Sequence, residues 1–440
     1  MKKCRIRRGG SFALKTLGCK TNRADSGKIS ARLHAAGWTP SVGNPTLCIV
    51  NSCCVTARSE NKAFKAALAF KKANPLSEVV LSGCVADSLS AKAHEAGIEV
   101  KRKIPIPDGE TEGRDIYPQG PFHRYFLKVQ NGCDNFCAYC VVPILRGAPI
   151  SFDKESIMRE LDDLAGRFVL PGEIVLTGTN INLYKDSGSD IIDLIYAIRK
   201  KYSCRIRMSS LEPPFEKDFI KRLSGAGLIC PHFPVPLQSG SDRILKKMGR
   251  KYDTFVFEKT LEEIRKYYDN PAITTDIIYG FPGETEKDFT ATLHFMEKAA
   301  FSKSHVFHFS RRPGTLASLY QETPQVVMKE RQKRIFAAAE QTAERYRKKF
   351  IGKKLEVVVE NAPWQNVRSC KSAGADGGRA KAQRGEWFYG TSDNYLKVKF
   401  SAENMNVLPG DIVRVAADGI EQGIMQGIAR ETLWTIKAKK

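Results

Sequence analysis

Three cysteines in one short loop are the residues of this 440-residue chain with the most evident chemistry. Cys133, Cys137 and Cys140 form a C-x3-C-x2-C array that follows a strand-like run at residues 124–130. A structural zinc site uses four protein ligands, and no fourth Cys or His lies nearby in the sequence. An iron–sulfur cluster held by three thiolates leaves one iron open to another ligand. The array therefore indicates an open cluster; a zinc knuckle with a distant fourth ligand and three unpaired buried thiols are the alternatives.

A second trio of cysteines lies far apart in the first 84 residues. Cys19, Cys53 and Cys84 each end a strand-like run, and helical patterns at residues 26–38 and 59–74 separate these runs. Such alternation predicts parallel strands with right-handed crossovers, and ligands bind beyond the carboxyl ends of such strands. We therefore expect the three thiols at one edge of a sheet, where they suit another cluster with an open iron. The alternative is that cysteine serves there as a small buried apolar residue.

The charge of the chain favours a polyanionic partner. The formal net charge is +22, and residues 1–120 carry 20 Lys and Arg against 10 Asp and Glu. A basic surface of this size is typical of nucleic-acid binding, although a solvated basic surface is the alternative. No apolar run approaches the roughly 20 residues that span a bilayer, and the amino end lacks the apolar core of a signal peptide. We therefore expect a cytoplasmic protein with no membrane partner.

The middle of the chain alternates strand-like and helical segments. Six strand–helix units in about 220 residues predict an incomplete barrel rather than a closed eight-unit barrel. Each later strand ends in a small or polar cluster suited to the barrel mouth, and glycines there let the backbone approach a ligand. The strand-like runs are at residues 124–130, 173–177, 205–208, 233–237, 273–278 and 305–309.

The last part of the chain changes pattern. A long amphipathic helix is expected at residues 324–350, and five short β runs follow it, which predict a small β-barrel. Residues 370–385 are rich in Gly, Ala and basic residues and predict a mobile loop. Aromatic residues of these β runs can stack on bases, with core packing as the alternative. They are Trp387, Phe388, Tyr389 and Tyr395.

These motifs together resemble a known family. The C-x3-C-x2-C array resembles the signature of the radical S-adenosylmethionine superfamily. The elements TLGCKTN, VNSCCVT and LSGC around the earlier cysteines resemble the three cysteine motifs of its methylthiotransferases. The resemblance covers residues 12 to 431. It implies an α/β chain with a flavodoxin-like parallel-sheet domain (12–118), a partial (β/α)6 radical S-adenosylmethionine barrel (119–345) and a small β-barrel that resembles the TRAM domain (346–431).

The resemblance also implies two 4Fe–4S clusters and S-adenosylmethionine as cofactors. Cys133, Cys137 and Cys140 would hold the cluster that binds S-adenosylmethionine, and Cys19, Cys53 and Cys84 would hold an auxiliary cluster. Cys54 directly follows Cys53 and could replace it as a ligand, although alignment at Val55 favours Cys53. Five residues at the strand ends would border S-adenosylmethionine: Thr177, Gly178, Glu212, Gln238 and Ser239. Arg146 is similar to a family arginine near the substrate, with a surface ion pair as the alternative.

The implied reaction is the methylthiolation of an unactivated C–H bond through a 5′-deoxyadenosyl radical, with sulfur supplied through the auxiliary cluster. The opening T-L-G-C-K looks most like the branch that acts at C2 of N6-threonylcarbamoyladenosine 37 in the anticodon loop of tRNA. Isopentenyladenosine 37 of tRNA and a ribosomal-protein aspartate are the alternatives within the family, and a non-catalytic metal-containing RNA-binding protein is the alternative outside it. An electron donor such as a flavodoxin or ferredoxin is the further partner implied.

Overall fold

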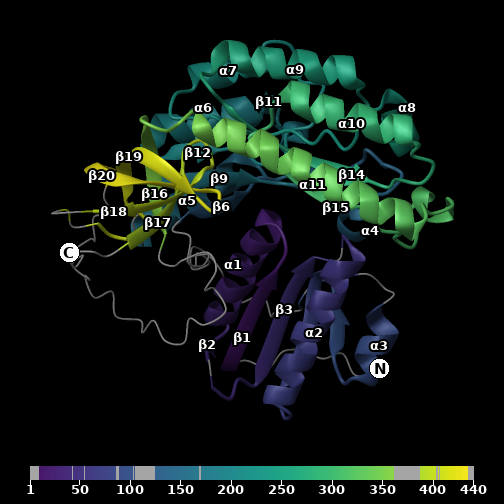
Figure 1. The fold of residues 1–440 in the computed structure, drawn as a ribbon. Helices are drawn as coiled ribbons and strands as arrows, with labels where there is room; N and C mark the ends of the chain where they lie inside the picture. Colours follow the sequence, from purple (N-terminus) through teal and green to yellow (C-terminus); the bar gives the residue numbers. More distant parts are fainter. Residues whose placement is uncertain are drawn as a thin grey trace.

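Three structural units follow one another along the chain (Figure 1). The computed structural model describes residues 9–41, 43–53, 55–85, 89–102, 104, 124–167, 170–360, 387–402, 405 and 407–434. Cys54, the loop expected at residues 370–385 and the expected domain boundary at residue 118 lie outside these residues. None of the helices described has both the length and the apolar composition needed to cross a membrane.

The first unit is a parallel sheet with helices on both faces, as the sequence predicts. Its strand order is β2-β1-β3-β4-β5, and all pairings are parallel. The strands are β1 (Gly10–Leu17), β2 (Trp38–Pro40), β3 (Leu47–Cys53), β4 (Glu78–Cys84) and β5 (Glu99–Lys101). The helices are α1 (Lys20–Ala35), α2 (Ala57–Ala73) and α3 (Ser90–Glu95). Leu33 of α1 packs with Phe12 and Ile49 on one face, whereas Phe64 of α2 packs with Val50 on the other.

Two details of this unit differ from the sequence prediction. The strands β2 and β5 were not expected, because three-residue edge strands give almost no periodic signal. The helix expected at residues 26–38 begins earlier, since α1 starts at Lys20. The start of α1, before residue 26, lacks apolar periodicity because polar side chains on it, such as Thr21 and Asp25, contact the second unit rather than the sheet.

The second unit contains the six parallel strands that the sequence predicts for a partial barrel. They form two three-stranded sheets, in the orders β12-β9-β6 and β13-β14-β15, and the bridge between Ile206 and Ile229 links β12 to the segment before β13. The strands are β6 (Tyr125–Lys128), β9 (Glu173–Thr177), β12 (Arg205–Arg207), β13 (His232–Pro234), β14 (Ala272–Tyr279) and β15 (Lys303–His308). One large apolar core joins them to the surrounding helices.

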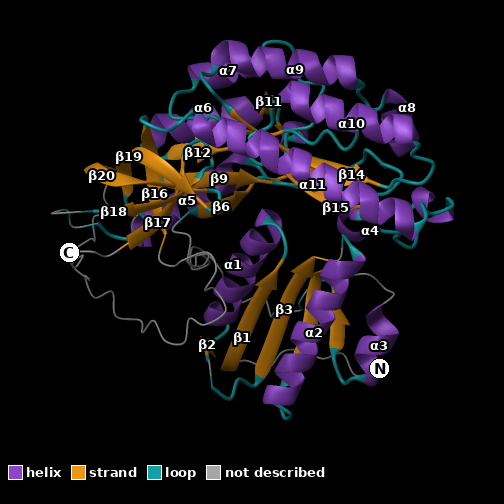
Figure 2. Ribbon diagram, in the orientation of Figure 1, coloured by secondary structure: helices purple, strands orange, loops and turns teal. Residues whose placement is uncertain are grey.

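Helices cover the outer side of these strands (Figure 2). In this view α6 to α10 lie on the side away from the first unit, and the carboxyl ends of β1 and β3 point toward the second unit. The helices are α4 (Val142–Arg146), α5 (Lys154–Arg167), α6 (Ile191–Lys201), α7 (Phe219–Gly225), α8 (Asp242–Met248), α9 (Thr254–Tyr267), α10 (Glu286–Ala299) and α11 (Gln325–Lys348). Four two-residue strands complete the unit: β7 (Gln130–Asn131) with β8 (Ile150–Ser151), and β10 (Lys185–Asp186) with β11 (Ser189–Asp190).

The third unit is a closed five-stranded barrel, which confirms the predicted small β-barrel. Its strand order is β16-β17-β18-β20-β19. Tyr346 and Phe350, at the end of α11 and just after it, belong to the core of this barrel, so the long helix joins the second and third units. The strands are β16 (Lys354–Glu360), β17 (Trp387–Ser392), β18 (Lys397–Ser401), β19 (Ile412–Glu421) and β20 (Ile424–Trp434).

Candidate functional site

The first trio of cysteines lies at one edge of the first sheet. Cys53 and Cys84 end neighbouring strands and are partners in register. Cys19 is the N-cap residue of α1, two residues after the end of β1. A Cβ added at Gly18 would lie 2.9 Å from the Cβ of Cys53, so β1 ends close against this thiol. Three residues 34 and 31 positions apart in the sequence therefore meet at the carboxyl ends of β1, β3 and β4, where we expected them.

The second trio lies in the loop after β6 and β7. The amide of Val142 and the guanidinium of Arg250 donate hydrogen bonds to the sulfurs of Cys140 and Cys137, at 3.4 and 3.2 Å. Donors aimed at sulfur stabilise thiolates, which are the form that ligates metal. Burial raises the pKa of Cys140 to about 12 and also raises the pKa of Cys133, so thiolates here require a compensating cation. This donor set fits an iron–sulfur cluster.

Arg146 connects the two trios. It ends α4, which begins two residues after Cys140, and its Nε donates to the sulfur of Cys84 at 3.0 Å. Its other nitrogens contact Asp25 of α1 at 3.3 Å and Asn131 at 2.8 Å. The side chain is only 10% exposed, which excludes the surface ion pair considered from the sequence. The carboxyl edge of the first sheet therefore faces the cysteine loop of the barrel.

Glutamine 130 organises the strand ends next to this loop. Its side-chain oxygen accepts from the amides of Thr179 and Asn180, while its nitrogen donates to the carbonyl of Gly132. A Cβ at Gly178 would come within 2.9 Å of the Gln130 oxygen, so glycine lets this contact form. The turn that follows β9 is thereby held against the cysteine loop.

The five residues predicted to border S-adenosylmethionine lie in environments that differ from one residue to the next. The Thr177 hydroxyl lies 3.4 Å from that of Thr21 in α1, and Gly178 packs on Gln130. Glu212 pairs with Arg250 at 2.9 Å. Gln238 has a φ of +67° and pairs through its backbone with β14. Ser239 is fully buried, and its hydroxyl lies 3.3 Å from that of Thr292 in α10, behind the strand ends.

Polar atoms without a partner mark the same strand ends. Among the described residues, the side-chain oxygens of Asn180 and Ser209 are buried and have no hydrogen-bond partner. Both follow the carboxyl ends of β9 and β12, and Asn180 also lines a cavity of about 260 Å³ together with Glu212 and Lys251. Buried polar atoms are normally hydrogen-bonded. These atoms therefore fit a polar ligand such as S-adenosylmethionine.

The described part of the chain has no group of three His, Cys, Asp or Glu side chains arranged around a single metal ion. All nine described cysteines are free of disulfides. The cluster ligands therefore stay predictions, drawn from the motifs and from the placement of the two trios.

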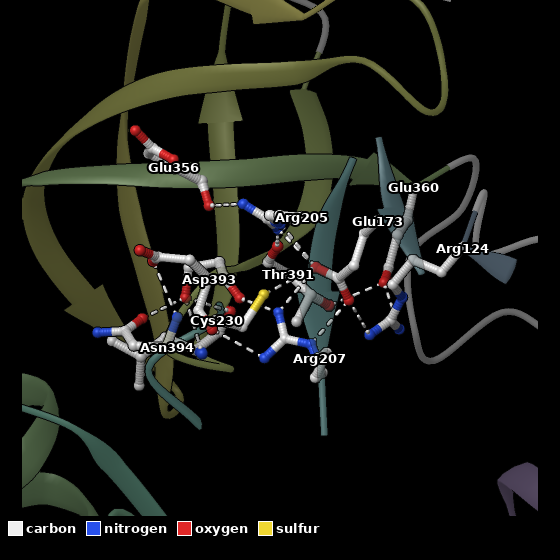
Figure 3. A network of polar contacts seen from close by, with 12 residues as sticks. Arg124, Glu173, Arg205, Arg207, Cys230, Glu356, Glu360, Thr391, Asp393 and Asn394 are labelled. Carbon is white, nitrogen blue, oxygen red and sulfur yellow. Dashed lines mark hydrogen bonds and ion pairs between the residues drawn. The ribbon is translucent and has the colours of Figure 1, made fainter. Parts of the chain in front are cut away.

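A network of buried charges joins the barrel to the third unit (Figure 3). Glu173 is fully buried and accepts hydrogen bonds from Arg205 and Arg207 at 2.7 to 2.8 Å. Arg124 lies 3.6 Å from Glu173 and 2.9 Å from Glu360 of β16. Burial alone would raise the pKa of Glu173, but Arg207, Arg205 and Arg124 outweigh it and hold this pKa well below its ordinary value.

Sequence reasoning missed several residues of the site. Arg250 and Gln130 act through side-chain contacts to segments distant in the sequence, and Asp25 contacts Lys128 of β6 at 2.5 Å. No local sequence pattern predicts such contacts. The sequence signal available for Arg250 is the preceding glycine, Gly249, which indicates a helix end. In the structure Gly249 has a φ of +72° and turns the chain toward the cysteine loop.

Comparison with known proteins defines first the class and then the family. The Radical SAM superfamily matches residues 127–296, and the Uncharacterized protein family UPF0004 matches residues 11–102. In a solved structure, the radical S-adenosylmethionine methyltransferase TsrM from Kitasatospora setae shares the fold with a TM-score of 0.51 at 16% identity, over 71% of this chain and 77% of that chain. The second unit is thus a radical S-adenosylmethionine domain, whose class uses a 4Fe–4S cluster and S-adenosylmethionine.

Comparison with curated relatives identifies the family within this class. The threonylcarbamoyladenosine tRNA methylthiotransferase MtaB of Thermotoga maritima is 36% identical over 79% of this chain and 86% of its own length. The corresponding protein of Chlamydia pneumoniae is 32% identical over 81% and 88%. A tRNA-2-methylthio-N(6)-dimethylallyladenosine synthase of Corynebacterium efficiens is 31% identical over 92% and 83%. The chain therefore belongs to the radical S-adenosylmethionine methylthiotransferase family and is an enzyme.

Proposed function

We propose that this enzyme methylthiolates C2 of N6-threonylcarbamoyladenosine at position 37 of tRNA. One observation supports the two-centre chemistry that this requires: Arg146 reaches from the cysteine loop of the barrel to Cys84 of the first sheet, at 3.0 Å. The relatives named for threonylcarbamoyladenosine support the substrate. The net charge of +22 supports an RNA partner, since neutralisation of phosphates dominates affinity for nucleic acids.

In this proposal each trio of cysteines holds one 4Fe–4S cluster, the auxiliary one at Cys19, Cys53 and Cys84. When bound, the clusters and S-adenosylmethionine supply the radical that removes a hydrogen atom from an unactivated C–H bond and the sulfur that replaces it. The residues that border S-adenosylmethionine are Thr177, Gly178, Glu212 and Gln238, with Ser239 supporting their turn from behind. An electron donor such as a flavodoxin or ferredoxin is required as well.

The chain's own side chains position these components. Gln130 holds the turn after β9 close to the cysteine loop. Arg250 contacts Cys137 and Glu212 together, so it links the loop to the end of β12. The contact between Arg146 and Asp25 fixes the position of the first sheet relative to the barrel mouth. A substrate base between the two trios would therefore meet a fixed geometry, which is where much of an enzyme's rate acceleration originates.

Isopentenyladenosine 37 is the second candidate substrate, because relatives named for that nucleoside match up to 93% of the chain at 30 to 32% identity. A base in an anticodon loop is accessible in single-stranded form for both candidates. They differ in the side chain on N6, which is acidic in one and apolar in the other.

Mass spectrometry of tRNA nucleosides from cells that lack this gene tests the proposal. We expect the 2-methylthio derivative of threonylcarbamoyladenosine to disappear and that of isopentenyladenosine to stay. Cells complemented with the Cys84→Ala variant should remain deficient. Cells complemented with Cys48→Ala should recover, because Cys48 is buried in the apolar core of the same sheet. An unchanged profile of methylthio nucleosides in the deletion strain would refute a tRNA substrate.

A further inference from the structure

Lys20 lies at the place where all three units meet. It directly follows Cys19 and is the first residue of α1. Its ammonium lies 5.5 Å from the centre of the Tyr395 ring, which comes from the turn between β17 and β18 of the third unit. Within the described part of the chain, this ammonium forms no hydrogen bond or ion pair. A partly buried cation at a domain junction therefore has no direct ion-pair partner, although Glu173 lies within electrostatic range of it.

Two further polar groups near Lys20 also lack partners. Asp276 of β14 and His305 of β15 are neighbours in register, and among the described residues neither side chain has a hydrogen bond or ion pair. Ile273 and Ile277 pack in the apolar core, so Asp276 lies on the opposite face of β14. The charge of Lys20 influences the pKa of both groups, which places them within electrostatic range. Lys20, Asp276 and His305 are only partly exposed, and a gathering of charged and polar groups without direct partners at such a place indicates a ligand site.

This junction lies between the two trios of cysteines. Cys19 precedes Lys20, and Thr21 contacts Thr177 at the carboxyl end of β9. On the other side, Arg250 lies within electrostatic range of Asp276 and 3.2 Å from the sulfur of Cys137. A nucleoside placed for reaction between the trios would therefore bring the group on its N6 atom within reach of Lys20.

We propose that Lys20 binds the carboxylate on the N6 side chain of the substrate nucleoside and thereby selects an acidic nucleoside over an apolar one. The Tyr395 hydroxyl is a second donor to the same carboxylate, and Asp276 accepts hydrogen bonds from N–H or O–H groups of that side chain. This inference depends on the proposed function, since a threonylcarbamoyl group carries a carboxylate, N–H groups and a hydroxyl, whereas an isopentenyl group carries none of them.

The chemistry of the two substrates accounts for the selectivity. A charge-assisted hydrogen bond to a carboxylate is among the strong polar contacts. An apolar side chain at the same place would exclude water and leave the ammonium and the Asp276 carboxylate without partners. Sites built to bind a polar group reject analogues that lack it for this reason. The same junction would therefore favour one nucleoside and disfavour the other.

Two synthetic anticodon stem–loops test the assignment with the anaerobically reconstituted enzyme. One carries N6-threonylcarbamoyladenosine, and the other carries a neutral analogue with a methyl group in place of the carboxylate. We expect the wild type to prefer the acid on the order of 100-fold in kcat/KM for the methylthio product. Lys20→Gln should reduce this preference to less than about fivefold, mainly because kcat/KM for the acid falls, and Lys20→Arg should restore it.

Lys28→Gln is the matched control, because it removes the same charge from the same helix while Lys28 pairs with Glu160 away from the junction. It should keep the wild-type preference. Iron is measured in each variant. If Lys20→Gln loses iron, Tyr395→Phe replaces it, since that change leaves α1 untouched and should also reduce the preference.

Three outcomes would overturn the inference. One is a Lys20→Gln enzyme, or its Tyr395→Phe replacement, that keeps the preference for the acid. Another is an equal loss on both stem–loops, which would assign Lys20 to the RNA backbone or to the cluster. The third is seen with an additional stem–loop that carries isopentenyladenosine: a wild-type enzyme that modifies this stem–loop but not the threonylcarbamoyladenosine one would refute the proposed substrate as well. In the first two cases the proposed function stands.

Discussion

The radical S-adenosylmethionine barrel meets its two neighbours through junctions of opposite character. Toward the third unit, Glu173 is surrounded by Arg124, Arg205 and Arg207, and these side chains are at most 7% exposed (Figure 3). Toward the first unit, Lys20 and Asp276 are half-buried, yet neither has a hydrogen bond or ion pair with a described residue. The same types of side chain therefore have partners of opposite charge at one junction and no direct partner at the other.

The difference between the two junctions distinguishes charged residues that hold the units together from charged residues that are available to a ligand. A buried charge with a complete set of partners holds two elements in one relative position, because any displacement leaves it uncompensated. A buried charge without partners destabilises the fold, and natural proteins retain such residues mainly at functional sites. The barrel is thus fixed on the third unit by paired charges, while the junction with the first unit keeps its polar groups for a ligand.

Breaking the paired junction should give the largest effect. Glu173→Gln removes the single carboxylate that three arginines share, and we expect the free energy of unfolding to fall by about 3 to 5 kcal/mol. Chemical denaturation at neutral pH measures this change. The matched control is Glu262→Gln, which breaks an exposed pair with Lys259 and should cost less than about 1 kcal/mol. Equal effects of the two variants would mean that the buried network does not hold the units together.

Arg146 belongs to the junction with the first unit, and its replacement should affect turnover more than stability. Arg146→Lys keeps the charge but cannot contact Cys84, Asp25 and Asn131 together. We expect the rate of methylthio product formation to fall about 10- to 100-fold, since small displacements at an active site have effects of this size. Cleavage of S-adenosylmethionine without substrate should change less than about threefold, because it needs only the barrel.

Arg312→Lys provides the control for this experiment. Arg312 also connects the barrel to the first unit, through Glu60 of α2 at 2.5 Å, but it has no hydrogen bond with any of the described cysteines. It should lower stability to a similar extent and reduce product formation less than about threefold. If both variants lose product equally, Arg146 has only a structural role in joining the units.

Most of the fold follows from the sequence because its elements are locally encoded. The six barrel strands and the five strands of the third unit are recognisable, since apolar runs between turn residues mark them. The short strands β2 and β5 and the start of α1, before residue 26, are not recognisable in this way. Their residues respond to neighbouring chain segments rather than to a local pattern, and Asp25, which contacts β6, is one example.

The candidate site was predictable only in part, for a related reason. The cysteines are visible because their number and spacing are chemically unusual. Arg250 and Lys20, by contrast, are ordinary basic residues in the sequence, and only the fold brings them beside Cys137 and Tyr395. Whether such a residue is paired or unpaired depends on elements more than 100 positions away, so no local pattern reveals it.

Removing the unpaired carboxylate should give the smallest effect, and it should be a gain. Burial raises the pKa of Asp276 to about 6, against the attraction of Lys20 and Arg250. At pH 7.5 the carboxylate is therefore ionised at a cost, and Asp276→Asn should stabilise the protein by about 1 to 2 kcal/mol once partial solvent access is taken into account. The variant should also lose product formation if Asp276 contacts the substrate.

The change in stability caused by a substitution should depend on pH at one junction and not at the other. A carboxyl group with a raised pKa binds its proton more readily in the folded state, so the wild type regains stability as the pH falls toward the ordinary value near 4. The advantage of Asp276→Asn should therefore shrink by somewhat less than about 1 kcal/mol between about pH 7.5 and 5.5. The deficit of Glu173→Gln should stay constant over the same range, because the pKa of Glu173 lies well below it. An advantage of Asp276→Asn that did not change with pH would mean that Asp276 is not buried as an unpaired charge.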